Sequence, residues 1–207
     1  MKTLLHICCA PCANMCIDTL RQEGQDVTGF WYNPNIHPFT EYRARRNCLR
    51  DYAVTISLPL IEKNDYGLRP FVRAVADDIE HRCIKCYEMR LFEAAKTASE
   101  QGFDAFTSSL FISPYQQHEL MKEVAERAAD EYHIAFAYRD FRPLFRQGQE
   151  RARELGINLV WVTHDLFDPR VVSRQGVRDQ INDYMRTVMR EEPIDPSLEI
   201  LTDENSW

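Results

Sequence analysis

The sequence predicts a single α/β domain built on a mainly parallel sheet that helices cover on both faces. Its 207 residues are 44% hydrophobic and 28% charged, which is the composition of an ordinary globular domain. Short runs of apolar and β-branched residues alternate with longer amphipathic stretches. Strands that alternate with helices favour a parallel sheet, because each helix carries the chain back across one face of that sheet.

The elements of the first half follow from these runs and from the residues that end them. Buried strands in parallel sheets are short and apolar, whereas helices show a longer repeat of three to four residues. The predicted strands are Thr3–Cys8, Val27–Tyr32 and Val54–Leu60, and the predicted helices are Ala13–Gln22, Phe39–Tyr52, Leu68–Asp78 and Lys85–Gln101.

The second half continues the alternation. Gly102 is expected to end the long helix before it, since glycine adopts the left-handed conformation that closes many helices. The strands predicted after it are Asp104–Leu110, His133–Tyr138 and Leu159–Thr163, and the helices are Tyr115–Tyr132, Pro143–Leu155 and Pro169–Arg190.

The charge of the chain is unevenly distributed. The formal net charge is −7, but residues 191–207 contain six acids and neither Lys nor Arg, which leaves residues 1–190 nearly neutral. We therefore expect a domain over 1–190 and an acidic tail over 191–207. No apolar run approaches the ~20 residues that span a bilayer, and the start of the chain lacks a secretory signal pattern. These features predict a cytoplasmic protein with no membrane partner.

Two arginine clusters lie within the nearly neutral body. Arg43, Arg45, Arg46 and Arg50 follow Glu41, and residues 139–153 hold five arginines against two acids. Local basic surfaces of this kind bind phosphates even on an acidic protein. Each cluster is equally consistent with an ordinary solvated helix face.

The cysteines carry the strongest chemical signal. Seven are present, at positions 8, 9, 12, 16, 48, 83 and 86, and an odd number in a reducing compartment argues against a disulfide framework. Five of them form Cys8-Cys9-x-x-Cys12 and Cys83-x-x-Cys86, spacings at which two thiolates face one ion or cluster. The alternatives are buried structural thiols, a structural zinc, or a redox disulfide between Cys83 and Cys86.

The predicted elements place these cysteines at positions suited to ligands. Cys8, Cys9 and Cys12 lie on a strand-to-helix turn at the carboxyl end of a strand, where open α/β sheets bind ligands. Cys83 and Cys86 lie at the start of a helix, where free amide groups stabilise thiolates. Cys16 and Cys48 lie inside predicted helices and are interpreted as buried thiols.

Several ordered motifs resemble one known family, the epoxyqueuosine reductase QueH family. The resemblance covers about residues 3–156. The motifs are His6-Ile-Cys-Cys-Ala-Pro-Cys12, Tyr32-Asn-Pro-Asn-Ile-His-Pro38, Cys83-Ile-Lys-Cys-Tyr-Glu-Met-Arg-Leu91, Phe103-Asp-Ala-Phe-Thr-Ser-Ser-Leu110, Ile112-Ser-Pro-Tyr-Gln116, Tyr138-Arg-Asp-Phe-Arg-Pro143 and Phe145-Arg-Gln-Gly-Gln149.

This resemblance implies a Rossmann-like domain of the HUP or PP-loop-like type, with cysteines in place of a pyrophosphate loop. It also implies two-electron removal of the epoxide oxygen of epoxyqueuosine at the tRNA wobble position, which gives queuosine. The implied cofactors are a [4Fe-4S] cluster and a mononuclear iron. Carried over by position, Cys8, Cys9, Cys83 and Cys86 are metal ligands and Cys12 is a ligand of the neighbouring iron; Cys12 and Cys9 are the expected catalytic residues.

One segment departs from the family pattern. Family members often continue after a stretch like Arg151–Gly156 into a segment that ends in Cys-Gly-Cys, and this chain has no cysteine there. No G-x-G-x-x-G fingerprint of a nicotinamide or flavin site follows a strand either. We therefore expect electrons to come from an external carrier protein, and tRNA to be the macromolecular substrate.

Further candidate residues lie on the loops around the expected site. Substrate contact is the hypothesis for these, against loop capping or a surface ion pair: Asn33, Asn35, His37, Arg90, Ser113, Tyr115 and Gln116. Arg90 follows Cys86 on the same helix, so it is also a candidate to contact phosphate or to stabilise the cysteine thiolates. Tyr32, Phe39, Tyr87 and Tyr115 are candidates for stacking on a base, although aromatic residues at such positions are usually core. His6 is interpreted as a hydrogen-bonded core histidine, and Asp104 as a structural residue.

Two other functions fit the same residues. A zinc-binding module would use the thiolates as structural ligands only. An ATP-dependent tRNA-modifying enzyme would use the same fold, but the sequence contains no phosphate-cradling loop.

Overall fold

The computed structural model describes residues 1–157. Its elements, in chain order, are β1 (Lys2–His6), α1 (Ala10–Gln22), β2 (Asp26–Trp31), α2 (Phe39–Thr55), β3 (Leu60–Glu62), α3 (Leu68–Val75), α4 (Arg82–Glu100), β4 (Ala105–Ser108), the 3-10 helix η1 (Ser109–Ile112), α5 (His118–Tyr132), β5 (Ala135–Phe136), the 3-10 helix η2 (Arg142–Leu144) and α6 (Phe145–Glu154). The expected elements at Leu159–Thr163 and Pro169–Arg190, and the expected tail over 191–207, lie outside the described residues.

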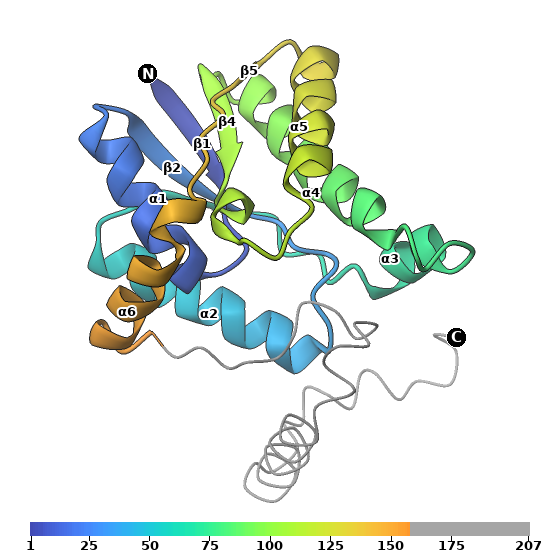
Figure 1. The fold of residues 1–207 in the computed structure, drawn as a ribbon, viewed down its shortest axis with the longest axis horizontal. Coiled ribbons are helices and arrows are strands. Elements are labelled where there is room, and N and C mark those ends of the chain that lie inside the picture. The colour runs from blue at the N-terminus through green and yellow to red at the C-terminus, as the bar shows by residue number, and fades with distance from the viewer. Residues whose placement is uncertain (158–207) are drawn as a thin grey trace, which may run out of the picture. The chain divides into compact units, whose positions relative to one another are not determined.

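The five strands form one parallel sheet in the order β3-β2-β1-β4-β5, which confirms the predicted α/β class. The chain first moves outward from β1 to β2 and β3, and then returns to the other side of β1 for β4 and β5. Because such crossovers are right-handed, α1 and α2 cover one face and α4 and α5 the other (Figure 1). The connections that leave β1 and β4 therefore run to opposite faces of the sheet, so the carboxyl edge between these two strands is the position at which open α/β sheets usually bind ligands.

The central strand β1 is apolar because both of its faces are covered. Leu4 and Leu5 point to opposite faces and neither is exposed to solvent. In the neighbouring strand β2, a Cβ on Gly29 would lie 3.0 Å from side-chain carbons of Ile7 and Leu60. The absence of a side chain at Gly29 thus lets the residues after β1 pack closely over β2.

The prediction of a strand over Val54–Leu60 is wrong. Helix α2 continues through Thr55, and its last turn buries Tyr52 and Ala53. Ser57 then adopts a left-handed conformation with φ 51°, and β3 begins only at Leu60, opposite Gly29. The β-branched residues of this segment favour a strand, but burial of the helix end outweighs that weak preference.

Other boundaries differ by smaller amounts. Strand β4 ends at Ser108, and the next four residues form η1. Helix α5 starts at His118 rather than Tyr115, and β5 contains only Ala135 and Phe136. Helix α4 starts at Arg82, so that its first two turns contain both Cys83 and Cys86.

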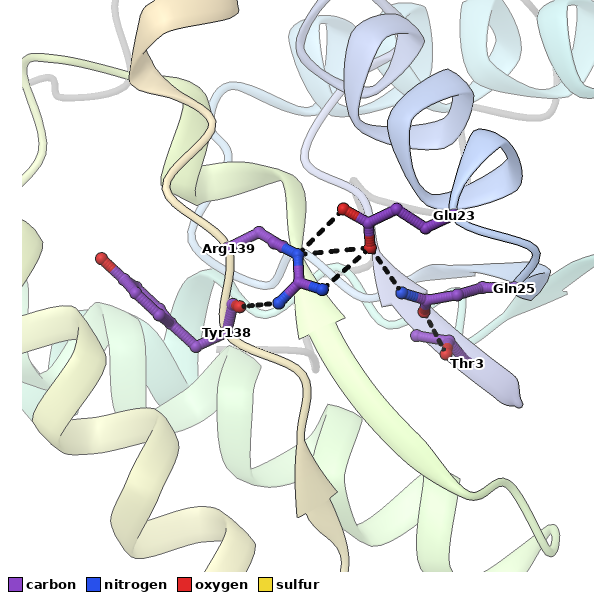
Figure 2. Close-up of polar contacts among 5 residues, drawn as sticks. All are labelled: Thr3, Glu23, Gln25, Tyr138 and Arg139. Atoms are coloured by element: carbon purple, nitrogen blue, oxygen red, sulfur yellow. Dashed lines mark hydrogen bonds and ion pairs between the residues drawn. The ribbon is translucent and has the colours of Figure 1, made fainter.

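A polar network fixes the segment that follows β5 (Figure 2). The Arg139 guanidinium donates to both carboxylate oxygens of Glu23, which follows α1, at 3.0 to 3.2 Å, and to the Tyr138 carbonyl at 2.9 Å. Gln25 donates to the Glu23 carboxylate at 3.0 Å and accepts from Thr3 of β1 at 2.7 Å. The chain is thereby tied to the end of α1 before it enters α6.

Helix α6 packs on α1 through a buried amide. Asn14 Nδ2 donates to the Gly148 carbonyl at 2.8 Å, and Asn14 is not exposed to solvent. A Cβ on Gly148 would lie 3.2 Å from Asn14 Oδ1, so the glycine permits this close approach. None of the helices within residues 1–157 combines the length and the apolar character that crossing a bilayer requires.

Candidate metal centre

Three cysteines meet in the turn between β1 and α1. The sulfur atoms of Cys8, Cys9 and Cys12 all lie within 4.8 Å of one another, and those of Cys8 and Cys9 are 3.9 Å apart. Cys8 is 2% exposed and Cys9 7% exposed. Cys9 is the N-cap residue of α1, so Cys12 lies in the first turn of the helix. The spacing of these cysteines predicted that they would lie together, and they do so in the turn at the carboxyl end of the central strand.

Neighbouring loops hold this turn in place. The Cys8 amide donates to Ser109 Oγ at 3.2 Å, and Ser109 Oγ donates in turn to Cys8 Sγ at 3.6 Å. On the other side, Asn33 Nδ2 donates to the Ile7 carbonyl at 2.9 Å. The loops that follow β4 and β2 therefore support the cysteine turn from both sides. Ser109 was not among the predicted site residues, and the only signal for it in the sequence was its place at the end of a predicted strand.

The chemistry of the three thiols fits a metal group. Hydrogen bonds from the Cys8 and Cys9 thiols, followed by burial, raise the pKa of Cys12. For Cys9, a hydrogen bond with Cys12 lowers the pKa, but contact with Cys8 and burial outweigh it and raise the pKa overall. Three thiolates at this separation repel one another unless a cation lies among them. A thiophilic metal supplies that charge, and these residues are therefore able to hold one.

A buried ion pair adjoins the same turn. Arg45 and Glu41 of α2 form an i,i+4 pair with side chains that are 11% and 4% exposed. Burial opposes the charge of Arg45, but negative charge on Cys9 and on Glu41 raises its pKa overall. The sequence predicted that Arg45 belongs to a basic surface cluster. The i,i+4 spacing of Arg45 from Glu41 indicated an ion pair, but the burial of that pair depends on how α2 packs and could not be predicted from the spacing.

The second cysteine pair lies on α4, outside the compact group of three. Cys86 Sγ accepts a hydrogen bond from Arg90 Nη2 at 3.0 Å, and the Cys86 carbonyl accepts from Arg90 Nε, also at 3.0 Å. Arg90 is 4% exposed. The surface ion pair that was one interpretation of Arg90 is therefore wrong: the side chain lies inside the site and contacts a predicted metal ligand.

His6 is the hydrogen-bonded core histidine that the sequence predicted. Its Nδ1 lies 2.9 Å from Ser108 Oγ and its Nε2 lies 3.1 Å from the Tyr32 carbonyl. Burial, and then the positive charge of Arg90, lower its pKa to about 4. At neutral pH the ring is uncharged, donates through Nε2 and accepts at Nδ1. Asp104 also has a structural role, since its carboxylate accepts from the Lys2 amide at 2.7 Å.

The loop after β2 buries polar atoms without pairing them. Asn33, Asn35 and His37 are 0%, 7% and 8% exposed. Asn33 Oδ1, Asn35 Oδ1 and both ring nitrogens of His37 have no hydrogen-bond partner among the described residues. His37 lies between the rings of Tyr66 and Phe71, and burial lowers its pKa to about 4. Buried polar atoms of this kind need a partner, and a ligand can be that partner.

The loop before α5 presents the remaining candidates in different ways. Ser113 Oγ accepts from the Tyr115 amide at 3.3 Å and so caps a turn. Tyr115 is 73% exposed and contacts Phe145 edge to face. Gln116 Oε1 accepts from the Tyr87 hydroxyl at 2.7 Å, and that hydroxyl also accepts from the Gln117 amide. Tyr87 is 1% exposed, so it links α4 to this loop and is excluded as a stacking surface.

Most arginines of the two basic clusters are engaged within the chain. Arg50 pairs with Glu62, Arg139 with Glu23, Arg142 with Asp140 and Arg151 with Asp18. Arg146 and Arg153 are exposed on α6 and form no ion pair with an acid of residues 1–157. The phosphate-binding interpretation of these clusters is thus confined to a few residues.

Comparison with known proteins identifies the family. The family model described as "Epoxyqueuosine reductase QueH" matches residues 3–158. The chain belongs to this family. Over 156 residues it is 35% identical to the epoxyqueuosine reductase QueH of Dehalococcoides mccartyi, a match that covers 75% of this chain and 86% of the relative.

Two further QueH relatives extend beyond the matched region. The proteins of Histophilus somni and Acinetobacter baylyi are 38% and 39% identical over 135 residues, or 63% of this chain. Those matches cover 56% and 62% of the relatives. The QueH family match contains every candidate site residue, since the last of them is Gln116.

Proposed function

We propose that this chain is an epoxyqueuosine reductase, which converts epoxyqueuosine at the tRNA wobble position into queuosine. The observation that carries the proposal is the group of Cys8, Cys9 and Cys12, buried at the carboxyl end of the central strand in a chain of the QueH family. The reaction consumes two electrons and two protons, breaks both carbon–oxygen bonds of the epoxide, and releases water as the alkene forms.

The cofactors of the proposal are a [4Fe-4S] cluster and a mononuclear iron. Cys8, Cys9, Cys83 and Cys86 would hold the metals, and Cys12 would bind the iron beside the cluster; Cys9 and Cys12 are the proposed catalytic residues. When bound, such a group supplies electrons one at a time and a Lewis acid for the departing oxygen. Five thiolates exceed the four that a single cluster or zinc ion needs, which favours two metals over one.

The protein around the thiols would keep water away and hold the ligands rigid. Cys8 and Cys9 are almost fully buried, and Ser109 fixes the Cys8 sulfur. The guanidinium of Arg45 places positive charge near Cys9, and because Glu41 neutralises it, the pair as a whole carries no net charge. Low solvent access strengthens each of these electrostatic interactions.

The substrate would bind at the carboxyl edge of the sheet, beside the loop after β2. Asn33, Asn35 and His37 offer buried acceptors, and a neutral His37 also offers a donor, none of which has a partner among the described residues. A modified base splayed from the anticodon loop carries hydroxyl and amine groups that match them. Ser113 and Gln116 would act indirectly, by ordering the loop before α5. Arg90 would act through its contact with Cys86. Tyr115 is largely exposed and would stack on a base.

The partners of the proposal are tRNA and an external electron-donor protein, in the cytoplasm. Arg146 and Arg153, which lack an ion pair within residues 1–157, are the proposed phosphate contacts. Replacing both with Gln should weaken tRNA binding and reduce its salt dependence by about two counterions. The control is Arg142→Gln, because Arg142 is already neutralised by Asp140.

The decisive experiment is complementation. The gene is expressed in cells that lack their own epoxyqueuosine reductase, and digested tRNA is analysed for queuosine. Queuosine is the expected product, and persistent epoxyqueuosine would contradict the proposed substrate. Anaerobically purified protein should be brown and contain iron and sulfide, whereas colourless protein that holds only zinc would favour a structural module.

The metal ligands are tested by single substitutions. Cys83→Ser and Cys86→Ser should abolish iron binding and queuosine formation together. Cys48→Ser is the control, since Cys48 lies on α2 and is not a member of the compact cysteine group; this variant should retain iron and activity. Activity that persists after loss of iron would show that the proposed electron route is wrong.

A further inference from the structure

Arg90 is a buried cation that pairs with no carboxylate of the described residues. Among residues 1–157 no arginine is more buried, at 4% exposure, and no carboxylate of these residues lies within ion-pair distance of it. Two other partly buried arginines do have one: Arg45 pairs with Glu41 and Arg151 with Asp18. Arg90 instead contacts the sulfur and the carbonyl of Cys86, and its guanidinium carbon lies 6.0 Å from the Tyr87 ring centroid.

This arrangement is unfavourable unless an anion is present. The free energy needed to remove a guanidinium from water is much larger than the free energy gained from contacts with a carbonyl and an aromatic ring. Buried cations in proteins are therefore paired with anions. No glutamate or aspartate of residues 1–157 provides that anion. The nearest group able to become negative is the Cys86 thiol, whose sulfur lies 3.0 Å from Arg90 Nη2.

The field of Arg90 also extends to the other half of the site. Its charge acts on the ring of His6, which lies two residues before Cys8, while negative charge on Cys8 acts on that ring with the opposite sign. His6 itself is neutral at pH 7, because burial and then the charge of Arg90 lower its pKa to about 4. Arg90 therefore contacts the cysteine pair on α4 directly and also acts electrostatically on a residue next to the cysteine turn.

Resting on the proposed function, we infer that Arg90 is a positioning residue that supplies the counter-charge for the metal-bound thiolates. It fixes the Cys86 sulfur through its planar donor group, and its charge favours the form of the metal group that carries one more electron. Arg90 then raises the reduction potential of that group. In this role Arg90 acts on the metal ligands and does not contact the substrate.

The test compares Arg90→Met, which removes the charge, with Arg90→Lys, which keeps it. Anaerobic redox titrations follow the iron–sulfur chromophore of the reconstituted full-length protein. Arg90→Met should shift the one-electron equilibrium toward the oxidised form at least tenfold, which corresponds to about 59 mV. Arg90→Lys should stay within about threefold of the wild type, because it retains the charge. Arg127→Gln, a surface change on α5, is the control.

A second measurement keeps the proposal falsifiable if a variant loses iron. In the metal-free protein Arg90 lacks its counter-charge, so Arg90→Met should have a thermal midpoint equal to or above that of the wild type. A purely structural arginine would instead lower the midpoint when replaced. A lowered metal-free midpoint, an unchanged potential, or loss of iron from both variants would overturn the proposal.

The two readouts do not depend on turnover. A wild-type protein that fails to reduce epoxyqueuosine but shows the potential shift would refute the proposed substrate and leave the role of Arg90 intact. A wild-type protein that binds only zinc would refute the proposed cofactor, and the metal-free midpoints would still test Arg90.

Discussion

His37 should make the protein sensitive to mild acid. Its ring is 8% exposed and contacts Tyr66 and Phe71, and a proton on it would create a buried cation with no acceptor among the described residues. The pKa is lowered from 6.5 to about 4 by burial. As the pH falls, the unfolded chain therefore binds the proton first, so the stabilisation is present above pH 6.5 and is lost as the pH falls toward 4.

The size of the effect follows from that shift. Each pKa unit corresponds to about 1.36 kcal/mol, so His37 accounts for about 2 to 3 kcal/mol of unfolding free energy lost between pH 7.5 and pH 4.5. Replacing His37 with Phe preserves the ring contacts and removes the titration. The variant should lose about 2 to 3 kcal/mol less than the wild type over the same interval.

Urea denaturation followed by far-ultraviolet circular dichroism at both pH values measures this difference. The control is His133→Asn, an exposed position with a left-handed backbone that asparagine tolerates. The control should keep the pH dependence of the wild type. If His37→Phe loses as much stability as the wild type, the burial argument for the loop after β2 is wrong.

Three further predictions concern separate parts of the chain. Glu41→Gln leaves Arg45 buried beside the cysteines and should lower the unfolding free energy of the metal-free protein by about 3 to 5 kcal/mol, whereas the double variant with Arg45→Met should recover most of it. Gly67→Ala would place a Cβ 2.3 Å from Pro34 Cβ and should cost about 1 to 3 kcal/mol in thermal denaturation; an unchanged midpoint would contradict this packing. A chain ending at residue 190 should keep full turnover and bind tRNA at least as tightly at low salt, because six acids are removed.

The sequence predicted the centre of the fold better than its edges. Strands with both faces covered are continuous apolar runs, so β1 and β2 were identifiable from Leu4, Leu5 and their neighbours. The segment after Tyr52 was not, because Val54 and Ile56 favour a strand locally while the burial of the helix end depends on distant residues. Pairing of Leu60 with Gly29 is likewise set by the sheet rather than by local preference.

The candidate site shows the same division. Thiol spacing was sufficient to bring Cys8, Cys9 and Cys12 together, because one short turn determines their positions. The position of Arg90 four residues after Cys86 made contact with the thiolates one interpretation, whereas Arg45 occurs in a sequence context typical of a solvated helix face. Only the packing of α2 and α4 against the sheet turns these arginines inward.

The cysteines after β1 and the cysteine pair on α4 lie in parts of the chain that should differ in their free energy of local unfolding. β1 is hydrogen-bonded on both edges, to β2 and β4, so its amide protons should exchange only when the whole sheet opens. The residues that lead into α4 are exposed from Ala76 to His81 and precede the cysteines on that helix directly. Local opening there would free Cys83 and Cys86 while Cys8 and Cys9 stay in place. A metal group that assembles in the folded chain would thus bind first to the fixed thiols after β1, and Cys83 and Cys86 would close on it when the start of α4 folds back.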